Sequence, residues 1–248
     1  MTIISSDLLH STGVVISGIS TRRGGVSPEP FGMNLSFNVG DAKDNVRRNR
    51  GLFAQALGIT ADHLAVPTQQ HSNVVRRANT GGSYPACDGL VTDTPGVYLC
   101  LTVADCVPIF IVDSSRRAIA AIHAGWRGTS AGIAERAVSM LVEEFRCRPD
   151  RMAAYLGPCA GKCCYVVGED VAGRFSREFL VVDGGRIFVD LKAANVSQLV
   201  ASGVPQSMID VSSYCTIHEA DLFHSYRRDG ASSGRMMGAI GLRPDPVH

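Results

Sequence analysis

Three short apolar runs follow one another in the middle of the chain, at residues 97–103, 107–112 and 118–123. Each run is rich in β-branched residues and is bounded by Pro, Asp, Ser or Gly, which predicts three β-strands. Apolar residues occupy nearly every position rather than every second one. That pattern is typical of strands covered on both faces. We therefore expect a sheet buried between two other layers.

Other segments extend this pattern. Residues 152–158, 208–215 and 236–243 predict further strands. Apolar positions at helical spacing predict helices over residues 45–57, 131–145, 169–179 and 191–202. Gly58 is the expected stop of the first helix, and Ser130 is the expected N-cap of the second. Strands outnumber helices and do not alternate with them, which favours an α+β fold: a single domain, residues 1–248, of mixed β-sheets flanked by helices.

Composition narrows the class of protein. The 248 residues suffice for a real core, and a net charge of +1 without a Lys/Arg-rich run argues against a nucleic-acid partner. No apolar run approaches the roughly 20 residues that span a bilayer, and the N-terminus lacks a signal-peptide pattern. We expect a cytoplasmic protein without membrane association. Its eight cysteines should then be reduced thiols or metal ligands.

Polar residues interrupt the apolar runs at a few points. Asp105 and Cys106 separate two predicted strands, His123 ends the next strand, and His71 precedes another apolar pair. Two imidazoles and a thiolate are suitable zinc ligands, and three protein ligands leave one position open for water or substrate. The spacing fits no short zinc-finger motif. From the residues alone, hydrogen-bonded structural histidines and a buried cysteine are the more common interpretation, and the metal site is the alternative to them.

Two nucleophile hypotheses compete with the metal site. Cys106 could be a nucleophile activated by His123, as in a cysteine hydrolase. The stretch "GTSAG" at residues 128–132 matches the G-x-S-x-G elbow, but the predicted strand ends several residues earlier, so Ser130 fits a helix cap better. The cluster Cys159, Cys163 and Cys164 fits either buried thiols or ligands, and its role stays open.

Several motifs occur together in one order: "STRRGGVS", "NLSFNVGD", "QQH", "CDGLVT", "TVADCVPI", "AAIHAGWRGT", "LGPCAGKCCY", "YCT" and "SYRRDG". This set resembles the YfiH-like, laccase-domain family, labelled multicopper polyphenol oxidase and regarded as zinc-dependent purine nucleoside phosphorylases. The resemblance runs from about residue 20 to residue 242. It implies a fold shared with cytotoxic-necrotizing-factor-type cysteine hydrolases, and it implies His71, Cys106 and His123 as the metal ligands.

The resemblance also implies an activity. It is phosphorolysis of adenosine, inosine and methylthioadenosine, with adenosine deamination as a side activity, so a purine nucleoside and phosphate would be the partners. Some relatives are peptidoglycan-editing amidases, which keeps Cys106 and His123 as an alternative catalytic pair. This chain departs from the family in "YVVG" at residues 165–168 and in His224, and either change could alter the pocket.

Roles for other residues follow from their chemistry. Arginine is the natural partner of phosphate, and the candidate phosphate- or substrate-binding residues lie in or near polar loops: Arg22, Asn38, Arg48, Arg127, Arg227 and Arg228. Asp105 could orient a histidine ring, as a catalytic residue next to a ligand, or could cap a turn. Trp126 could wall the pocket or pack in the core.

The metal can also be argued from the residues. With seven histidines and no H-x-H, the chain cannot ligate four coppers as a multicopper oxidase does. We expect one Zn²⁺ site, in which Cu²⁺ could substitute. A copper-dependent polyphenol oxidase is the remaining alternative function. The expected assembly is a monomer or small homo-oligomer.

Overall fold

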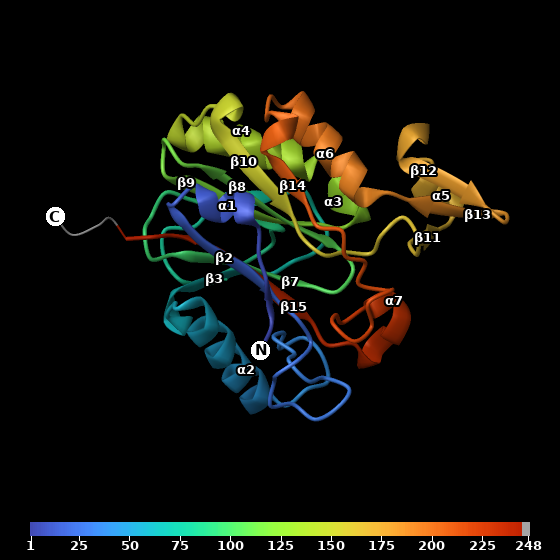
Figure 1. Cartoon of the computed structure of the whole chain (residues 1–248), viewed down its shortest axis with the longest axis horizontal. Coiled ribbons are helices and arrows are strands. Elements are labelled where there is room, and N and C mark those ends of the chain that lie inside the picture. Colours follow the sequence, from blue (N-terminus) through green and yellow to red (C-terminus); the bar gives the residue numbers. More distant parts are fainter. Residues whose placement is uncertain (245–248) are drawn as a thin grey trace.

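Two mixed β-sheets stack face to face in the middle of the molecule (Figure 1). The computed structural model describes residues 1–244, and the last four residues of the predicted domain, with His248 among them, lie outside the described part. The first sheet has the strand order β1 (Ile3–Ile4), β2 (Val15–Ser20), β15 (Met236–Leu242), β7 (Tyr98–Val103), β3 (Leu64–Pro67) and β5 (Gly82–Tyr84). The second has the order β14 (Ile209–Val211), β10 (Met152–Leu156), β8 (Val107–Asp113), β9 (Ala118–Ala124), β6 (Gly89–Thr92) and β4 (Val75–Arg77).

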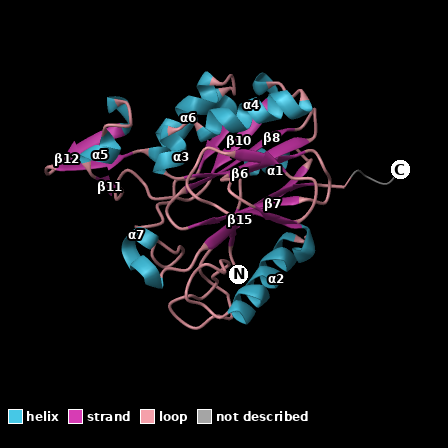
Figure 2. Ribbon diagram, turned by 180° about the vertical axis from the view of Figure 1, so that it is seen from behind, coloured by secondary structure: helices cyan, strands magenta, loops and turns pink. Residues whose placement is uncertain are grey.

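Helices cover the outer faces of both sheets (Figures 1 and 2). Three lie over the second sheet: α3 (Trp126–Ser130), α4 (Ile133–Phe145) and α6 (Leu191–Ala201). The first sheet is covered by α2 (Lys43–Leu57). A small sheet of β11 (Val166–Val167), β13 (Arg186–Val189) and β12 (Leu180–Asp183) projects at one side with α5 (Glu169–Ala172). The remaining helices are α1 (Asp7–Ser11) and α7 (Tyr226–Asp229).

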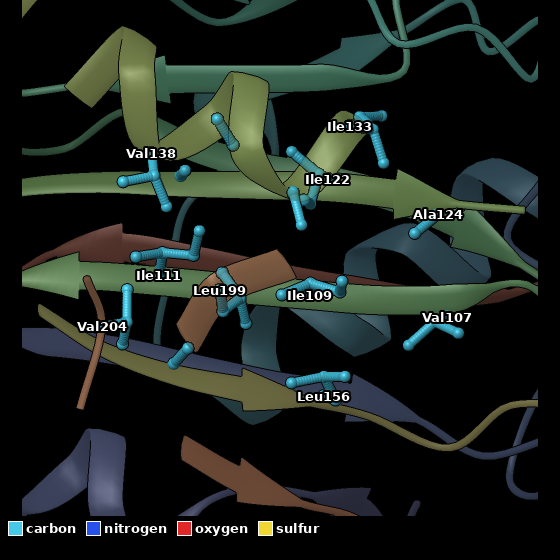
Figure 3. Packing of buried hydrophobic residues seen from close by; sticks show 14 of the residues in the cluster. Val107, Ile109, Ile111, Ile122, Ala124, Ile133, Val138, Leu156, Leu199 and Val204 are labelled. Carbon is cyan, nitrogen blue, oxygen red and sulfur yellow. The ribbon is translucent and has the colours of Figure 1, made fainter. Parts of the chain in front are cut away.

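Strand β8 shows why its sequence is apolar at nearly every position. Ile109 and Ile111 pack with residues of α4 and α6 (Figure 3), while Phe110 and Val112 pack with residues of the first sheet. All four side chains are fully buried. Burial of such a side chain contributes about 1.5–3 kcal/mol, so both faces of this strand stabilise the fold. The prediction of a sheet covered on both faces is confirmed.

The α+β class with mixed sheets and flanking helices is confirmed, and most predicted elements lie within two residues of their observed ends. Three predictions are wrong in detail. The helix predicted over residues 169–179 ends at Ala172 and is followed by turns. The strand predicted over residues 208–215 is limited to β14. Ser130 does not cap α4: it lies in α3, donates to the carbonyl of Arg127, and leaves the cap to Gly132.

Two local features of the strands position the side chains of the candidate site. Strands β7 and β8 are joined by a tight turn in which Asp105 has φ of 90°, a conformation that few residues other than glycine adopt. Strand β6 pairs antiparallel with β9 in a register that sets Gly89 opposite Ile122. A Cβ at Gly89 would lie 2.6 Å from Ile122 Cγ2, so glycine permits this approach and brings Asp88 beside His123.

Within residues 1–244, no helix combines the length and the apolar character needed to cross a bilayer. The cytoplasmic location stays a prediction.

Candidate metal centre and active site

Three side chains from distant parts of the sequence meet at one end of the stacked sheets. His71 follows β3, Cys106 lies in the turn between β7 and β8, and His123 lies near the end of β9. One ligand atom from each lies within 4.8 Å of the others. The two imidazole rings stand edge to face, with centroids 4.9 Å apart. Two nitrogens and one sulfur so close together form a donor set that suits zinc.

One carboxylate, that of Asp88, positions both histidines. Asp88 is fully buried, and its Oδ1 accepts hydrogen bonds from His123 Nδ1 and from the backbone N–H of His71, each at 2.9 Å. Its Oδ2 accepts from the backbone N–H and the hydroxyl of Ser72 at 2.7 and 2.8 Å. Since Nδ1 of His123 is held by Asp88, Nε2 is the nitrogen left to face Cys106 and His71.

Asp88, Cys106 and His123 each stabilise the charged form of a neighbour in this group. Burial alone would raise the pKa of Asp88, but the hydrogen bonds from His123 and Ser72 outweigh it and hold the pKa well below its usual range. Burial would likewise raise the pKa of the Cys106 thiol, but the adjacent His123 and His71 lower it. The thiolate and Asp88 in turn raise the pKa of His123 against the effect of its burial. The arrangement therefore favours a thiolate at Cys106.

A glycine leaves room for this cluster. Gly125 forms the N-cap of α3, directly after β9. A Cβ at this position would lie 3.0 Å from both Cys106 Sγ and His71 Cδ2. The start of α3 therefore closes over the donor set only because residue 125 has no side chain.

Asp105 does not orient a histidine, and that hypothesis is wrong. Its Oδ1 accepts from Thr216 Oγ1 at 2.6 Å, and its Oδ2 accepts from the backbone N–H of Arg227 at 2.7 Å. Asp105 thus ties the turn that carries Cys106 to Thr216, in the segment after β14, and to the first turn of α7. The carboxylate that orients a histidine is instead that of Asp88. Sequence analysis did not predict this role, although Asp88 lies in the motif "CDGLVT".

The three clustered side chains line a cavity of about 610 Å³. This size is within the range of small-molecule sites. Three aromatic and three cationic residues contribute to its wall: Trp126, Tyr165, Tyr226, Arg127, Arg227 and Arg235. Asn38 and Gln69 also line it. Asp105 is the one carboxylate of the lining, and both its oxygens are already engaged, so the cavity favours an anionic ligand.

The predicted arginines divide into two groups. Arg127 and Arg227 line the cavity; their guanidinium carbons lie 4.2 Å above the Trp126 ring and 4.8 Å above the Tyr165 ring. Arg22, Arg48 and Arg228 lie outside the lining, so the structure does not bring them to this cavity. Arg235, which the sequence reasoning did not select, takes a place in the wall.

Local contacts explain the three exclusions. Arg22 donates to the carbonyl of Ala220 and pairs with Glu29. The N–H groups of Arg228 donate to Asp229 and to the carbonyls of Thr216 and Phe223. Arg48 is exposed on α2.

A second cavity of about 680 Å³ adjoins the first. The two share Ser36, Asn38, Pro67 and Thr102, so these four residues lie between them. Phe37, Arg47 and Arg50 line the second cavity.

Comparison with known proteins identifies the family of this chain. The sequence profile of a family described as multi-copper polyphenol oxidoreductase laccase matches residues 16–243. The chain belongs to this family. Within the described residues 1–244, two groups of side chains could hold a metal ion, and one of them contains histidine. A multicopper oxidase needs several histidine-rich sites, so the ligands of this family member support a single imidazole-bearing centre.

Individual relatives of this laccase-like family carry other names. A Deinococcus radiodurans protein named purine nucleoside phosphorylase is 40% identical, over 98% of this chain and 95% of its own length. A prokaryotic protein named adenosine deaminase RL5 is 35% identical, over 91% of this chain and 93% of its own length. The crystal structure of YlmD from Geobacillus stearothermophilus superposes with a TM-score of 0.89 at 36% identity, covering 93% of this chain and 92% of that one.

Proposed function

We propose that this protein is a zinc-dependent purine nucleoside phosphorylase that acts on adenosine, inosine and methylthioadenosine, with adenosine deamination as a side activity. The observation that carries the proposal is the juxtaposition of a His₂Cys donor set with aromatic rings and arginines in one cavity. The names of the relatives support the same class of substrate. We propose His71, Cys106 and His123 as the zinc ligands.

The cavity offers separate surfaces to the two substrates. Aromatic side chains such as Trp126 and Tyr165 line the cavity, and a purine would pack against them. Arg127 and Arg227 present guanidinium groups, which suit phosphate because of their planar fork of donors. Arg227 is held in place by donating from Nη1 to the carbonyl of Val166 at 2.6 Å, which fixes its guanidinium group at the cavity wall. The adjoining cavity leaves room for a 5′ substituent.

Phosphorolysis makes one bond and breaks another. A phosphate oxygen bonds to C1′ of the ribose while the bond from C1′ to N9 breaks, and the purine leaves with the electron pair and takes up a proton. Arg127 and Arg227 would hold the phosphate against C1′, which replaces an encounter between two free molecules by a fixed geometry. A bound zinc ion would supply Lewis-acid polarisation of an oxygen or nitrogen beside the ligands. Deamination would need water directed at C6 of the same purine, with ammonia leaving.

The test combines metal analysis with a nucleoside assay. Protein purified without added metal is examined by mass spectrometry and incubated with inosine, with and without phosphate. For the natural sequence we expect hypoxanthine release that requires phosphate. The Cys106→Ser variant should bind one zinc equivalent less, and its activity should be lower by a factor of more than about 100. Copper in place of zinc would instead indicate the substitution that a His₂Cys set allows.

Two arginine substitutions test the phosphate contact, and the second is the control for the first. Arg127→Met should raise the KM for phosphate at least about tenfold, because a charged phosphate contact is lost. Arg48→Met, on the exposed face of α2, should leave the KM unchanged. Full activity in protein free of zinc, or equal effects of the two substitutions, would contradict the proposal.

A cysteine amidase of the peptidoglycan-editing type is the second candidate. The observation that favours it is the chain of contacts from Cys106 through His123 to Asp88, which has the order of a nucleophile, a base and an orienting carboxylate. Covalent trapping of Cys106 by an electrophilic amide in active, metal-free protein would favour this function over phosphorolysis.

A further inference from the structure

A second group of sulfur atoms lies outside the cavity. The Sγ atoms of Cys163, Cys164 and Cys215 lie within 4.8 Å of one another. Cys163 is exposed, Cys164 is half-buried and Cys215 is buried, so the group opens to solvent on one side. It shares no residue with the His71, Cys106 and His123 cluster, and none of the three cysteines lines the active-site cavity.

The local backbone brings these thiols together. Cys163 and Cys164 lie in a tight turn closed by hydrogen bonds from the N–H groups of Cys164 and Tyr165 to the carbonyl of Gly161, each 2.9 Å. Cys215 comes from a separate segment, which bridges to this one through Cys159. Gly161 provides the space: a Cβ there would lie 3.3 Å from Cys163 Sγ and 3.4 Å from Cys215 Sγ.

The surroundings of Cys215 suit a thiolate. The backbone N–H of Gly161 donates to Cys215 Sγ at 3.3 Å. Hydrogen-bond donors aimed at a sulfur stabilise its anionic form, which is the form that binds a metal.

The spacing of the sulfurs is close to that of a metal site. With a zinc–sulfur bond of about 2.3 Å, tetrahedral ligand sulfurs lie roughly 3.8 Å apart. A contraction of at most about 1 Å from the observed spacing therefore closes the group around one ion. A set consisting only of thiolates selects Zn²⁺ or Cu⁺ over hard cations.

We propose that Cys163, Cys164 and Cys215 form a second metal site for a thiophilic cation, Zn²⁺ or Cu⁺. This proposal does not depend on the reaction proposed above. The site joins two segments that end at the active-site cavity. Cys164 precedes Tyr165, which lines the cavity, and Cys215 precedes Thr216, whose hydroxyl donates to Asp105. An ion bound here would fix these two segments to each other and thereby brace the turn that carries Cys106.

Cadmium titration of the full-length reduced protein, after removal of bound metal, tests the proposal. Thiolate-to-cadmium absorbance counts the sulfurs bound, and mass spectrometry counts the ions. We expect two equivalents in the natural sequence. Cys163→Ser and Cys164→Ser should each lose one equivalent and more than half of the absorbance, because the second site holds three of the four expected thiolates. These two side chains are not fully buried, so their replacement should preserve the fold.

Two further variants separate the sites. Cys106→Ser should retain one equivalent and roughly three-quarters of the absorbance, since the second site is untouched. Cys147→Ser removes a buried thiol that belongs to neither group and should keep both equivalents. Competition by Zn²⁺ and, without oxygen, by Cu⁺ then shows which ion the site prefers. Binding of a single equivalent by the natural sequence, with absorbance unchanged in Cys163→Ser and Cys164→Ser, would overturn the proposal.

Discussion

Asp88 and Asp105 show what a sequence can reveal about single residues. Asp105 adjoins Cys106 in the chain, which made it the obvious partner for a histidine. The partner is instead Asp88, 35 residues before His123, because the pairing of β6 with β9 sets the two side by side. Sequence analysis predicted His71, Cys106 and His123 as ligands through their motifs, and the structure brings the three together. Sequence analysis could not identify Asp88, since strand register depends on packing between distant segments.

Replacement of Asp88 by asparagine should weaken metal binding. An amide keeps the shape of the side chain but removes the charge that fixes the tautomer of His123. We expect Asp88→Asn to lower zinc affinity about 10–100-fold, measured by competition with a chelator of known affinity. Asp113→Asn is the control, because Asp113 is a fully buried carboxylate that accepts backbone N–H groups of Ser115 and Arg148 far from the site. Equal affinities in both variants would contradict the role given to Asp88.

His224 should make the protein sensitive to acid. It is fully buried, and neither ring nitrogen has a hydrogen-bond partner among the described residues. Burial, together with the charges of Arg22 and Arg235, lowers its pKa from 6.5 to about 3. Below pH 6.5 the unfolded chain therefore binds a proton that the folded chain does not. The free energy of unfolding should fall by up to about 1.4 kcal/mol per pH unit as the pH is lowered from this point.

Urea unfolding between pH 7 and pH 5 measures this slope. His224→Gln has no titrating group at this position, so its stability should vary less over the same interval, whatever its absolute value. Parallel slopes for the variant and the natural sequence would show that His224 is not the source of the pH dependence.

At the scale of elements, the start of α3 is the part most closely fitted to the site. A methyl group at residue 125 would press on Cys106 Sγ and His71 Cδ2. Gly125→Ala should therefore lower metal affinity more than tenfold, because ligand placement has little tolerance. Gly51→Ala is the matched control in α2, where a Cβ meets nothing within 4 Å. That variant should bind metal normally and gain about 0.5–1 kcal/mol of stability. Thermal unfolding and chelator competition measure both quantities, and normal affinity in Gly125→Ala would refute the argument.

Element predictions succeeded where burial was uniform and failed where tertiary contacts ended an element early. The strands β7, β8 and β9 have continuous apolar sequences, so their bounds could be predicted closely. The segment 169–179 has helical spacing, but its chain turns after Ala172 and feeds β12 of the small sheet. The local sequence does not show that the helix ends at Ala172, because the pairing of β12 with β13 determines the path of the chain after it.

At the scale of the whole molecule, the class of fold could be predicted but not the order of the strands. Counting strands and helices gave a mixed α+β domain, which the stacked sheets and the superposition on YlmD bear out. The composition could not show that the two sheets pack on each other, nor that the site lies where a loop, a turn and a strand end meet. The monomeric or small oligomeric state stays a prediction.

The central place of β15 affects how the protein can be made. Among the described residues 1–244 this strand is the last, yet it pairs with both β2 and β7 in the first sheet. On the ribosome, β2 and β7 emerge long before the strand that separates them, and the edge that each turns toward β15 must stay unpaired until residues 236–242 have been made. A chain that stops before Met236 should therefore be captured by chaperones or degraded, whereas one that stops after Pro244 should accumulate as folded protein. Pulse-labelling of the two truncated chains in cells would measure this, and equal lifetimes would show that the first sheet closes without its last strand.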